Sequence, residues 1–323
     1  MNDMTPDQAK WFADVFGRLA TNIGQAVLGK QHVVRLALTC LVSEGHLLLE
    51  DFPGTGKTIL ARSLANTVQG SNSRIQFTPD LLPSDVTGVT IYDQSKRTFD
   101  FHPGPIFSTI VLADEINRAS PKTQSALLEV MEEGRVTVDG VSHNAGRPFM
   151  VIATQNPIEQ AGTYRLPEAQ LDRFLMKSSL GYPDHEATVA LLNESAVRDR
   201  TVSVQPVVTA EQISEMAKLA AGVHVDTAVL GYVSRLAEES RRHQHVKLGL
   251  SVRGCLAMVR TAKTWAASVG RNFVTPDDIK ELAVPVLSHR ILLDAEAQFA
   301  GTTVYEVIDA ILATVVPPTE RAA

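Results

Sequence analysis

The stretch Leu47–Thr58, LLLEDFPGTGKT, comes close to a phosphate-binding loop. The pattern of such a loop, G-x-x-x-x-G-K-[ST], needs two glycines, then a lysine and a serine or threonine. Gly56, Lys57 and Thr58 fill the last three positions, whereas the first position holds an aspartate, Asp51. The stretch is therefore either a nucleotide site with one substitution or a strand-to-helix turn that merely contains glycines.

The sequence on either side of the loop favours the nucleotide site. An apolar run, His46–Glu50, predicts a strand before the loop, and an amphipathic segment, Thr58–Val68, predicts a helix after it. Successive N–H groups between the two can form a nest for phosphate oxygens at the helix N-terminus. Asp51 fits this interpretation, because aspartate tolerates unusual turn conformations and the later half of the loop wraps the phosphates.

The loop also carries side chains suited to nucleotide chemistry. We expect Lys57 to reach the β- and γ-phosphates and the Thr58 hydroxyl to hold Mg²⁺. The loop residues predicted to bind the nucleotide are Pro53, Gly54, Thr55, Gly56, Lys57, Thr58 and Ile59.

Residues 109–115, TIVLADE, predict a buried strand that ends in two acids, Asp114 and Glu115. We expect this strand beside the first one, with Asp114 holding Mg²⁺, usually through water. Glu115 would then be the general base that activates the attacking water, a role worth ~10²–10⁴ in rate. The alternative is an exposed strand end with two solvated acids.

A third apolar strand, Phe149–Ala153, is followed by Thr154-Gln155-Asn156. A polar side chain at the end of a central strand can orient the attacking water, and Asn156 is the candidate for this role. The alternative is that Asn156 forms a turn before Pro157.

The order of the elements predicts a sheet sandwiched by helices, followed by a helical region. Strand-length apolar runs lie at 46–50, 74–77, 109–113, 149–154 and 176–180, and helical segments at 5–21, 31–43, 57–68 and 121–133. Two hairpins interrupt them, at 89–102 and at 135–144, the second with the type I′ pair Asp139-Gly140.

After Tyr182-Pro183-Asp184 the pattern becomes wholly helical, so we place a domain boundary at 183–186. This gives a nucleotide-binding α/β domain over 1–183 and a helical domain over 184–323. Six helices are expected, over roughly 184–196, 209–221, 226–244, 251–269, 275–288 and 302–314, with N-caps at Thr209, Asp226, Ser251 and Thr275.

Composition restricts the class of protein. The 323 residues carry a net charge of −6, which does not favour binding to DNA or anionic lipid. The N-terminal stretch lacks the pattern of a signal peptide, and no apolar run is long enough to span a membrane, so we expect a cytoplasmic protein. Cys40 and Cys255 lie in apolar helical patterns and are expected to be core residues. His243 and His245, two residues apart on a predicted helix, should face apart and bind no metal.

Two long runs resemble one family. IVLADEINRASPKTQSALLEVMEEGRVTVDG (110–140) and VIATQNPIEQAGTYRLPEAQLDRFLMK (151–177) are similar to the MoxR family of AAA+ ATPases, in which an acid at the first loop position is a familiar variant. The resemblance implies an α/β AAA+ P-loop NTPase core, with a five-stranded parallel sheet between helices, and then a small all-α lid. The two hairpins match insertions of this branch.

The resemblance also implies roles for further residues. Asn156 matches the first sensor, and Arg173 matches an arginine finger offered to the nucleotide of a neighbouring subunit. Arg253 matches the second sensor, which contacts the γ-phosphate from the lid, although the chain has Ser-Val-Arg where the family usually has Ser-Pro-Arg. Gly29 lies in a stretch that resembles the one packed around adenine. Each arginine is alternatively a solvated side chain on a helix.

The function implied by the resemblance is hydrolysis of ATP to ADP with Mg²⁺ in a ring, expected to be a hexamer. The ring would remodel or activate a protein client, with a partner that carries a von Willebrand factor A domain. The alternatives are a nucleic-acid motor, a magnesium-chelatase-like subunit and a non-hydrolysing nucleotide switch. The motor is disfavoured because the hairpins carry only Lys96, Arg97 and Arg135 as basic residues.

Overall fold

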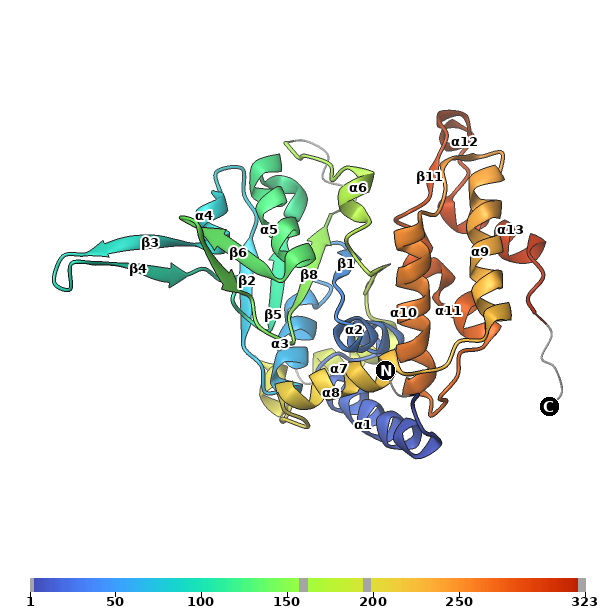
Figure 1. The fold of residues 1–323 in the computed structure, drawn as a ribbon, viewed down its shortest axis with the longest axis horizontal. Coiled ribbons are helices and arrows are strands. Elements are labelled where there is room, and N and C mark those ends of the chain that lie inside the picture. Colours follow the sequence, from blue (N-terminus) through green and yellow to red (C-terminus); the bar gives the residue numbers. More distant parts are fainter. Residues whose placement is uncertain (1–2, 157–161, 194–198, 319–323) are drawn as a thin grey trace.

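The computed structural model describes residues 3–156, 162–193 and 199–318. Its centre is a parallel sheet, from which the hairpin formed by β3 (Gly88–Asp93) and β4 (Thr98–Pro103) projects on one side. A bundle of long helices, α9 (Thr227–Arg242), α10 (Val252–Ser268) and α11 (Pro276–Leu287), lies on the other side (Figure 1). We call α9 to α13 the C-terminal helical region.

The central sheet has five parallel strands in the order β2-β5-β8-β1-β9, as expected. The prediction that the TIVLADE strand adjoins the first strand is wrong, because β8 lies between β1 and β5. Since all five strands are parallel, their carboxyl ends meet at one end of the sheet and their amino ends at the other. The strands are β1 (Leu47–Glu50), β2 (Asn72–Gln76), β5 (Ile110–Asp114), β8 (Met150–Gln155) and β9 (Met176–Ser178).

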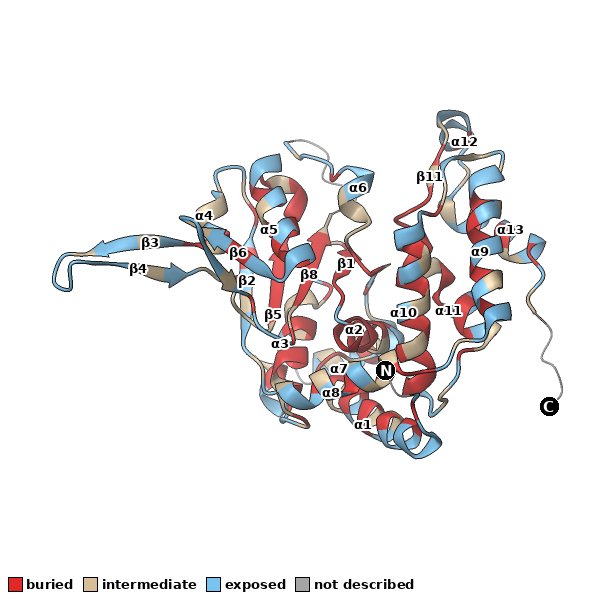
Figure 2. Ribbon diagram, viewed as in Figure 1, coloured by how far each residue is buried: buried red, intermediate tan, exposed pale blue. Residues whose placement is uncertain are grey.

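The central strands are mostly apolar, up to the polar residues at their carboxyl ends, because both faces of the sheet are covered (Figure 2). Alternate residues enter two different hydrophobic clusters: Leu47 and Leu49 join one cluster, and Leu48 joins the other. The first cluster contains residues of α1 (Pro6–Gly24), α2 (Gln31–Val42) and α3 (Lys57–Thr67), and the second contains residues of α4 (Pro83–Thr87) and α5 (Pro121–Glu133).

Both predicted hairpins form. The second pairs β6 (Arg135–Val138) with β7 (Val141–Asn144), and its turn residues Asp139 and Gly140 have φ angles of 50° and 79°. Positive φ at both positions is what a type I′ turn requires.

The helices after the sheet begin at the predicted N-caps, since Thr209, Asp226, Ser251 and Thr275 each accept a backbone hydrogen bond through the side chain. The region is not wholly helical, however, because β10 (Val246–Leu248) and β11 (Leu292–Leu293) form an antiparallel pair. The other elements are η1 (Ile116–Arg118), α6 (Glu168–Leu171), α7 (His185–Asn193), η2 (Arg200–Ser203), α8 (Ala210–Ala221), α12 (Ala295–Phe299) and α13 (Val304–Thr314).

His243 is the C-cap that follows α9 and His245 lies beyond it, with the two ring centroids 5.6 Å apart, so the expectation that they face apart on a helix is wrong. Within the described ranges, no three His, Cys, Asp or Glu residues are grouped to hold a metal. No helix in the described part of the chain is long and apolar enough to cross a membrane.

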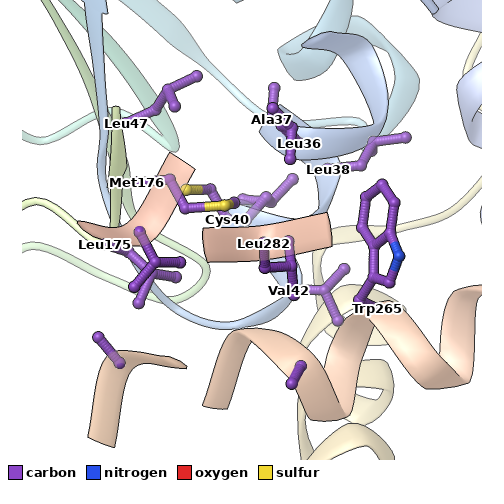
Figure 3. Packing of buried hydrophobic residues seen from close by; sticks show 14 of the residues in the cluster. Leu36, Ala37, Leu38, Cys40, Val42, Leu47, Leu175, Met176, Trp265 and Leu282 are labelled. Carbon is purple, nitrogen blue, oxygen red and sulfur yellow. The ribbon is translucent and has the colours of Figure 1, made fainter. Parts of the chain in front are cut away.

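The C-terminal helical region shares a hydrophobic cluster with the sheet. Trp265 of α10 and Leu282 of α11 belong to the same cluster as Met176 of β9 and the fully buried Cys40 of α2 (Figure 3). Cys40 is a core residue, as expected, and its burial raises the pKa of the thiol to about 12. Cys255 packs, partly buried, against the same cluster. The domain boundary near 183 stays a prediction.

Candidate functional site

The loop after β1 has the backbone shape of a phosphate nest. Gly54 and Gly56 have φ angles of 82° and 95°, in the left-handed region that favours glycine. A Cβ at either position would meet no atom within 4 Å, so the backbone conformation and not space requires glycine. Gly56 is the N-cap of α3, and the helix N-terminus that follows offers N–H groups to an anion.

Lys57 begins α3, directly after the loop. Its Nζ is 3.2 Å from the carbonyl oxygen of Phe52 and 3.5 Å from that of Asp51, so the ammonium group folds back over its own loop. A phosphate in the nest would offer this ammonium group a charged acceptor in place of neutral carbonyls, which is the stronger kind of hydrogen bond.

Asp51 has a structural role that the loop pattern does not reveal. Its buried carboxylate accepts hydrogen bonds from the Ser179 hydroxyl at 2.9 Å, the Leu180 N–H at 2.7 Å and the Gly181 N–H at 2.8 Å. These bonds join the end of β1 to the segment that follows β9. The residue at the first loop position is therefore a connection between two segments and not a degraded glycine.

The segment held by Asp51 approaches the predicted adenine stretch. Tyr182 stacks on Phe52 of the loop, with ring centroids 5.9 Å apart, and its carbonyl accepts a hydrogen bond from Lys30 Nζ at 2.7 Å. Gly29, beside Lys30, has a φ of 69°, and a Cβ there would lie 3.0 Å from Ala187. Gly29 thus lies close to the loop, which is compatible with its predicted role.

Asp114 and Glu115 end β5 and are held by a threonine of β8. The Thr154 hydroxyl donates to Asp114 Oδ1 at 2.6 Å and accepts from the Glu115 N–H at 2.9 Å. Arg74 of β2 donates to Asp114 Oδ2 at 2.6 Å. This threonine and this arginine went unrecognised in the sequence, where no local pattern marks them.

The Glu115 carboxylate is half-buried and accepts hydrogen bonds from Gln76 Nε2 at 2.8 Å and Arg118 at 2.9 Å. Glu115 has a φ of 57°, an uncommon conformation for a non-glycine residue and one found at functional sites. Gln76 pairs with Asp114 in the strand register, so β2 supplies a polar partner to each acid. Gln76 also went unrecognised in the sequence.

The predicted magnesium ligands are chemically suitable. Thr58 and Asp114 both offer oxygen atoms, which Mg²⁺ prefers, and one or two protein oxygens suffice because the ion keeps waters and binds phosphates. Arg74, which pairs with Asp114, has a half-exposed side chain that can move aside.

Asn156 directly follows β8, the strand between β1 and β5. The loop, Asn156 and the two acids therefore lie at the carboxyl end of the sheet. They follow the neighbouring strands β1, β8 and β5, and β1 and β5 are two strand spacings apart, roughly 10 Å. Pro157, the basis of the alternative turn interpretation, lies outside the described residues.

Arg173 and Arg253 lie at the opposite, amino end of the sheet. Both pair with Glu132 near the end of α5, Arg173 at 3.0 Å. They line a cavity of about 370 Å³ together with Gly45 and His46, which precede β1. The four residues of β1 separate this cavity from the loop by ~13 Å, at about 3.3 Å per residue.

The predicted contact of Arg253 to a γ-phosphate stays a prediction. In the structure Arg253 lies at the amino end of the sheet, away from the loop of its own subunit. The helix that carries Arg253 packs beside the amino end of the sheet, and this brings Arg253 to the carboxylate that also holds Arg173.

His46 lines that cavity, and as a neutral ring it makes a hydrogen bond through each of its two nitrogens. Its Nδ1 accepts from the Val151 N–H at 3.0 Å, which leaves the proton on Nε2, 2.9 Å from the Met131 carbonyl oxygen. Burial lowers the pKa of His46 to about 4.

Comparison with known proteins defines the class first. Residues 46–176 match the model of the ATPase family associated with various cellular activities (AAA), and residues 238–311 match the model of the AAA lid domain. A crystal structure from Cytophaga hutchinsonii has a TM-score of 0.90 and 36% identity, covering 97% of this chain and 98% of that one. The protein has the AAA+ α/β fold with a helical lid.

Full-length relatives then define the family. The chain is 38% identical to "Chaperone MoxR1" of Mycobacterium tuberculosis, over 93% of this chain and 82% of that protein. It is 32% identical to "Protein MoxR" of Paracoccus denitrificans, over 90% and 93%. It is also 44% identical to the uncharacterized protein YeaC of Bacillus subtilis, over 96% and 97%. This chain belongs to the MoxR family of AAA+ ATPases.

Proposed function

We propose that the protein hydrolyses ATP with Mg²⁺ and uses the energy to remodel or activate a protein client. The observation that carries this proposal is the meeting of the loop, Asn156 and the acids Asp114 and Glu115 at one end of the sheet. The loop and Lys57 would hold the phosphates. The metal, held by Thr58 and Asp114, would neutralise charge that develops on them.

Glu115 is the candidate general base. Its carboxylate accepts from Gln76 and Arg118 and therefore has a defined position before nucleotide binds. Asn156, one strand over, would orient the water that Glu115 activates.

We further propose that the active site is completed by a second copy of the chain. Arg173 and Arg253 lie too far from the loop of their own subunit to reach a nucleotide bound there. Since both pair with Glu132, both could instead contact one anion of another molecule. A neighbouring subunit whose loop faces the cavity at Glu132 would supply that anion, and repetition of this contact forms a ring, by resemblance a hexamer.

The surfaces of the hairpins favour a protein, and not a nucleic acid, as the client of the ring. On the projecting hairpin, Lys96 pairs with Asp93 and Asp100, at 3.4 and 3.2 Å, so its charge is compensated. Exposed apolar side chains instead stand on the hairpins, Phe99 and Val141 being 74% and 56% exposed. Such surfaces are typical of protein contacts and not of phosphate backbones. A partner with a von Willebrand factor A domain and the client itself rest on the family resemblance.

The experiment is a Glu115→Gln substitution, with ATP turnover and nucleotide affinity measured on the same preparation. We expect turnover to fall by ~10²–10⁴ while affinity stays within about threefold, because the general base acts on water and not on binding. Glu129→Gln, an exposed acid on α5, is the control. Near-normal turnover in Glu115→Gln would exclude Glu115 as the base, and an inactive wild-type protein would favour the nucleotide switch.

A further inference from the structure

We infer that Asp172 and the buried Arg290 are positioning residues that hold Arg173 and Arg253 as one unit. The inference rests on the proposed function, in which these two arginines meet the phosphates of a nucleotide on the neighbouring subunit. It goes beyond that function because it assigns the geometry of the arginine pair to two side chains that touch no nucleotide.

Asp172 connects the two arginine-bearing segments. It precedes Arg173 in the chain, and its Oδ2 accepts from the Ser251 hydroxyl at 3.1 Å. Ser251 is the N-cap of α10 and also accepts from the Gly254 N–H at 3.0 Å. One carboxylate is therefore bonded to the cap of the helix whose first turn contains Arg253.

Arg290 fixes this carboxylate from the other side. Its Nε donates to Asp172 Oδ1 at 2.7 Å, and its guanidinium also donates to the carbonyls of Phe174 at 2.6 Å and Leu175 at 3.1 Å. The Arg290 side chain is only 3% exposed. Arg290 lies three residues beyond the end of α11 and binds the chain on both sides of Arg173. Because an unpaired buried charge is costly, these bonds hold that segment in place.

Gly254 makes room for this arrangement. A Cβ at position 254 would lie 2.3 Å from Leu250 Cδ1 and 3.0 Å from Arg290 Cδ. A side chain there would displace the Leu250 side chain and press against Arg290, so the glycine beside Arg253 allows both residues to lie against the start of α10.

The result is a pair of guanidinium groups with a defined spacing. Arg173 and Arg253 come from different parts of the chain, yet both reach the same carboxylate, that of Glu132. Two oxygens of a triphosphate could replace the two oxygens of Glu132 without a rearrangement of either arginine. Such preorganisation matters because a displacement of about 1 Å can cost ~10²-fold in rate.

The test is an Asp172→Asn substitution, with turnover, KM for ATP and nucleotide affinity measured alone and after mixing with Glu115→Gln protein. We expect turnover to fall by about 10–10²-fold with affinity nearly unchanged, because the variant's own loop is intact. Mixing should restore activity, since the Glu115→Gln subunit supplies intact arginines and the Asp172→Asn subunit an intact base. A residue needed only for folding would not be rescued in this way.

The matched control is Asp278→Asn. Asp278 forms another buried aspartate–arginine pair, with Arg271 at 2.7 Å. It lies in the first turn of α11, whereas Arg290 lies beyond the other end of that helix, roughly 18 Å away at the helical rise per residue. It should lose stability without a loss of turnover per folded subunit. Ser251→Ala removes the cap hydroxyl, and with it the bond to Asp172 and the bond from the Gly254 N–H, but leaves the pair of Asp172 and Arg290 intact. It should show a smaller fall in turnover that mixing also reverses, and it serves if Asp172→Asn does not fold.

Two outcomes would overturn the inference: wild-type turnover in Asp172→Asn, or a loss that mixing does not restore while mixing does restore Arg173→Ala. If Arg173→Ala itself keeps full turnover, the proposed shared active site fails instead. The two failures are therefore distinguishable.

Discussion

The carboxyl and amino ends of β1 differ in how they are built. At the carboxyl end, backbone N–H groups and two glycines in open space form a nest, and Lys57 donates to two neutral carbonyls. At the amino end, the arginines are already paired with carboxylates, and Arg290 is buried. The first end is suited to receive an anion, and the second presents cations in a fixed arrangement.

The difference supports the proposal that two subunits form each active site. A nest of N–H groups binds phosphate through consecutive backbone groups of a single loop. A pair of arginines assists only when both are held at the correct spacing, which requires a packed support such as the one around Arg290. The two kinds of site occupy opposite ends of the same strand, so one subunit cannot bring them together.

Arg173→Ala tests the comparison most severely. We expect turnover to fall by ~10³–10⁵, as for other arginine fingers, with nucleotide affinity nearly intact because the loop is ~13 Å away. Turnover of mixtures with Glu115→Gln protein should exceed the sum of the two alone. Arg135→Ala, which removes an exposed arginine from the hairpin, is the control. A parallel loss of affinity in Arg173→Ala would contradict the separation of the two ends.

Asp51→Gly tests the carboxyl end. The free energy of unfolding should fall by on the order of 3 kcal/mol, because three donors lose a buried, charged acceptor. Denaturant titration measures this, and a fluorescent ATP analogue reports affinity, which should weaken as the segment around Tyr182 loosens. Asp139→Gly, in a turn where φ is already positive, is the control and should be nearly neutral. An unchanged stability would mean that Asp51 does not connect the two segments.

Acid should destabilise the folded protein through His46, which lies at the amino end of β1. The pKa of His46 is about 4 in the folded protein and about 6.5 in the unfolded chain, so the unfolded chain binds the proton more readily. The free energy of unfolding should therefore fall as pH drops from 6.5 to 4, by about 3 kcal/mol, at ~1.4 kcal/mol per pKa unit. In His46→Gln the fall between pH 7.5 and pH 5 should be smaller. His32→Gln, an exposed histidine, should retain the wild-type slope.

Glu132→Gln should have the smallest effect. Glu132 competes with phosphate for both arginines, and partly exposed ion pairs of this kind are worth up to about 1 kcal/mol each. We expect half-maximal turnover at a subunit concentration lower by about fivefold or less. Glu133→Gln, which affects only the exposed pair with Arg135, is the control. A large loss of turnover in Glu132→Gln would mean that Glu132 positions the arginines and does not compete for them.

Local signals allowed part of this molecule to be predicted. The turn at Asp139-Gly140 and the caps at Thr209 and Thr275 depend on neighbouring residues, and each formed at the predicted position. The loop was recognisable because its chemistry depends on consecutive N–H groups.

Features that depend on distant partners were missed or misplaced. The role of Asp51 requires Ser179, 128 residues away, and no spacing marks that pair. The insertion of β8 between β1 and β5 and the placement of Arg253 depend on how elements pack, which periodicity does not report. The pair β10 and β11 was missed because strands of three and two residues are too short to show alternation.

The opposite placement of nest and arginines has a consequence for assembly. An open row of n subunits contains n − 1 complete sites, because the first arginine pair and the last nest have no partner, whereas a closed ring contains n. Turnover per subunit should therefore rise with concentration more steeply than nucleotide binding does, and it should reach a plateau once rings close. Under the proposed arrangement, the degree of polymerisation itself would regulate the enzymatic rate.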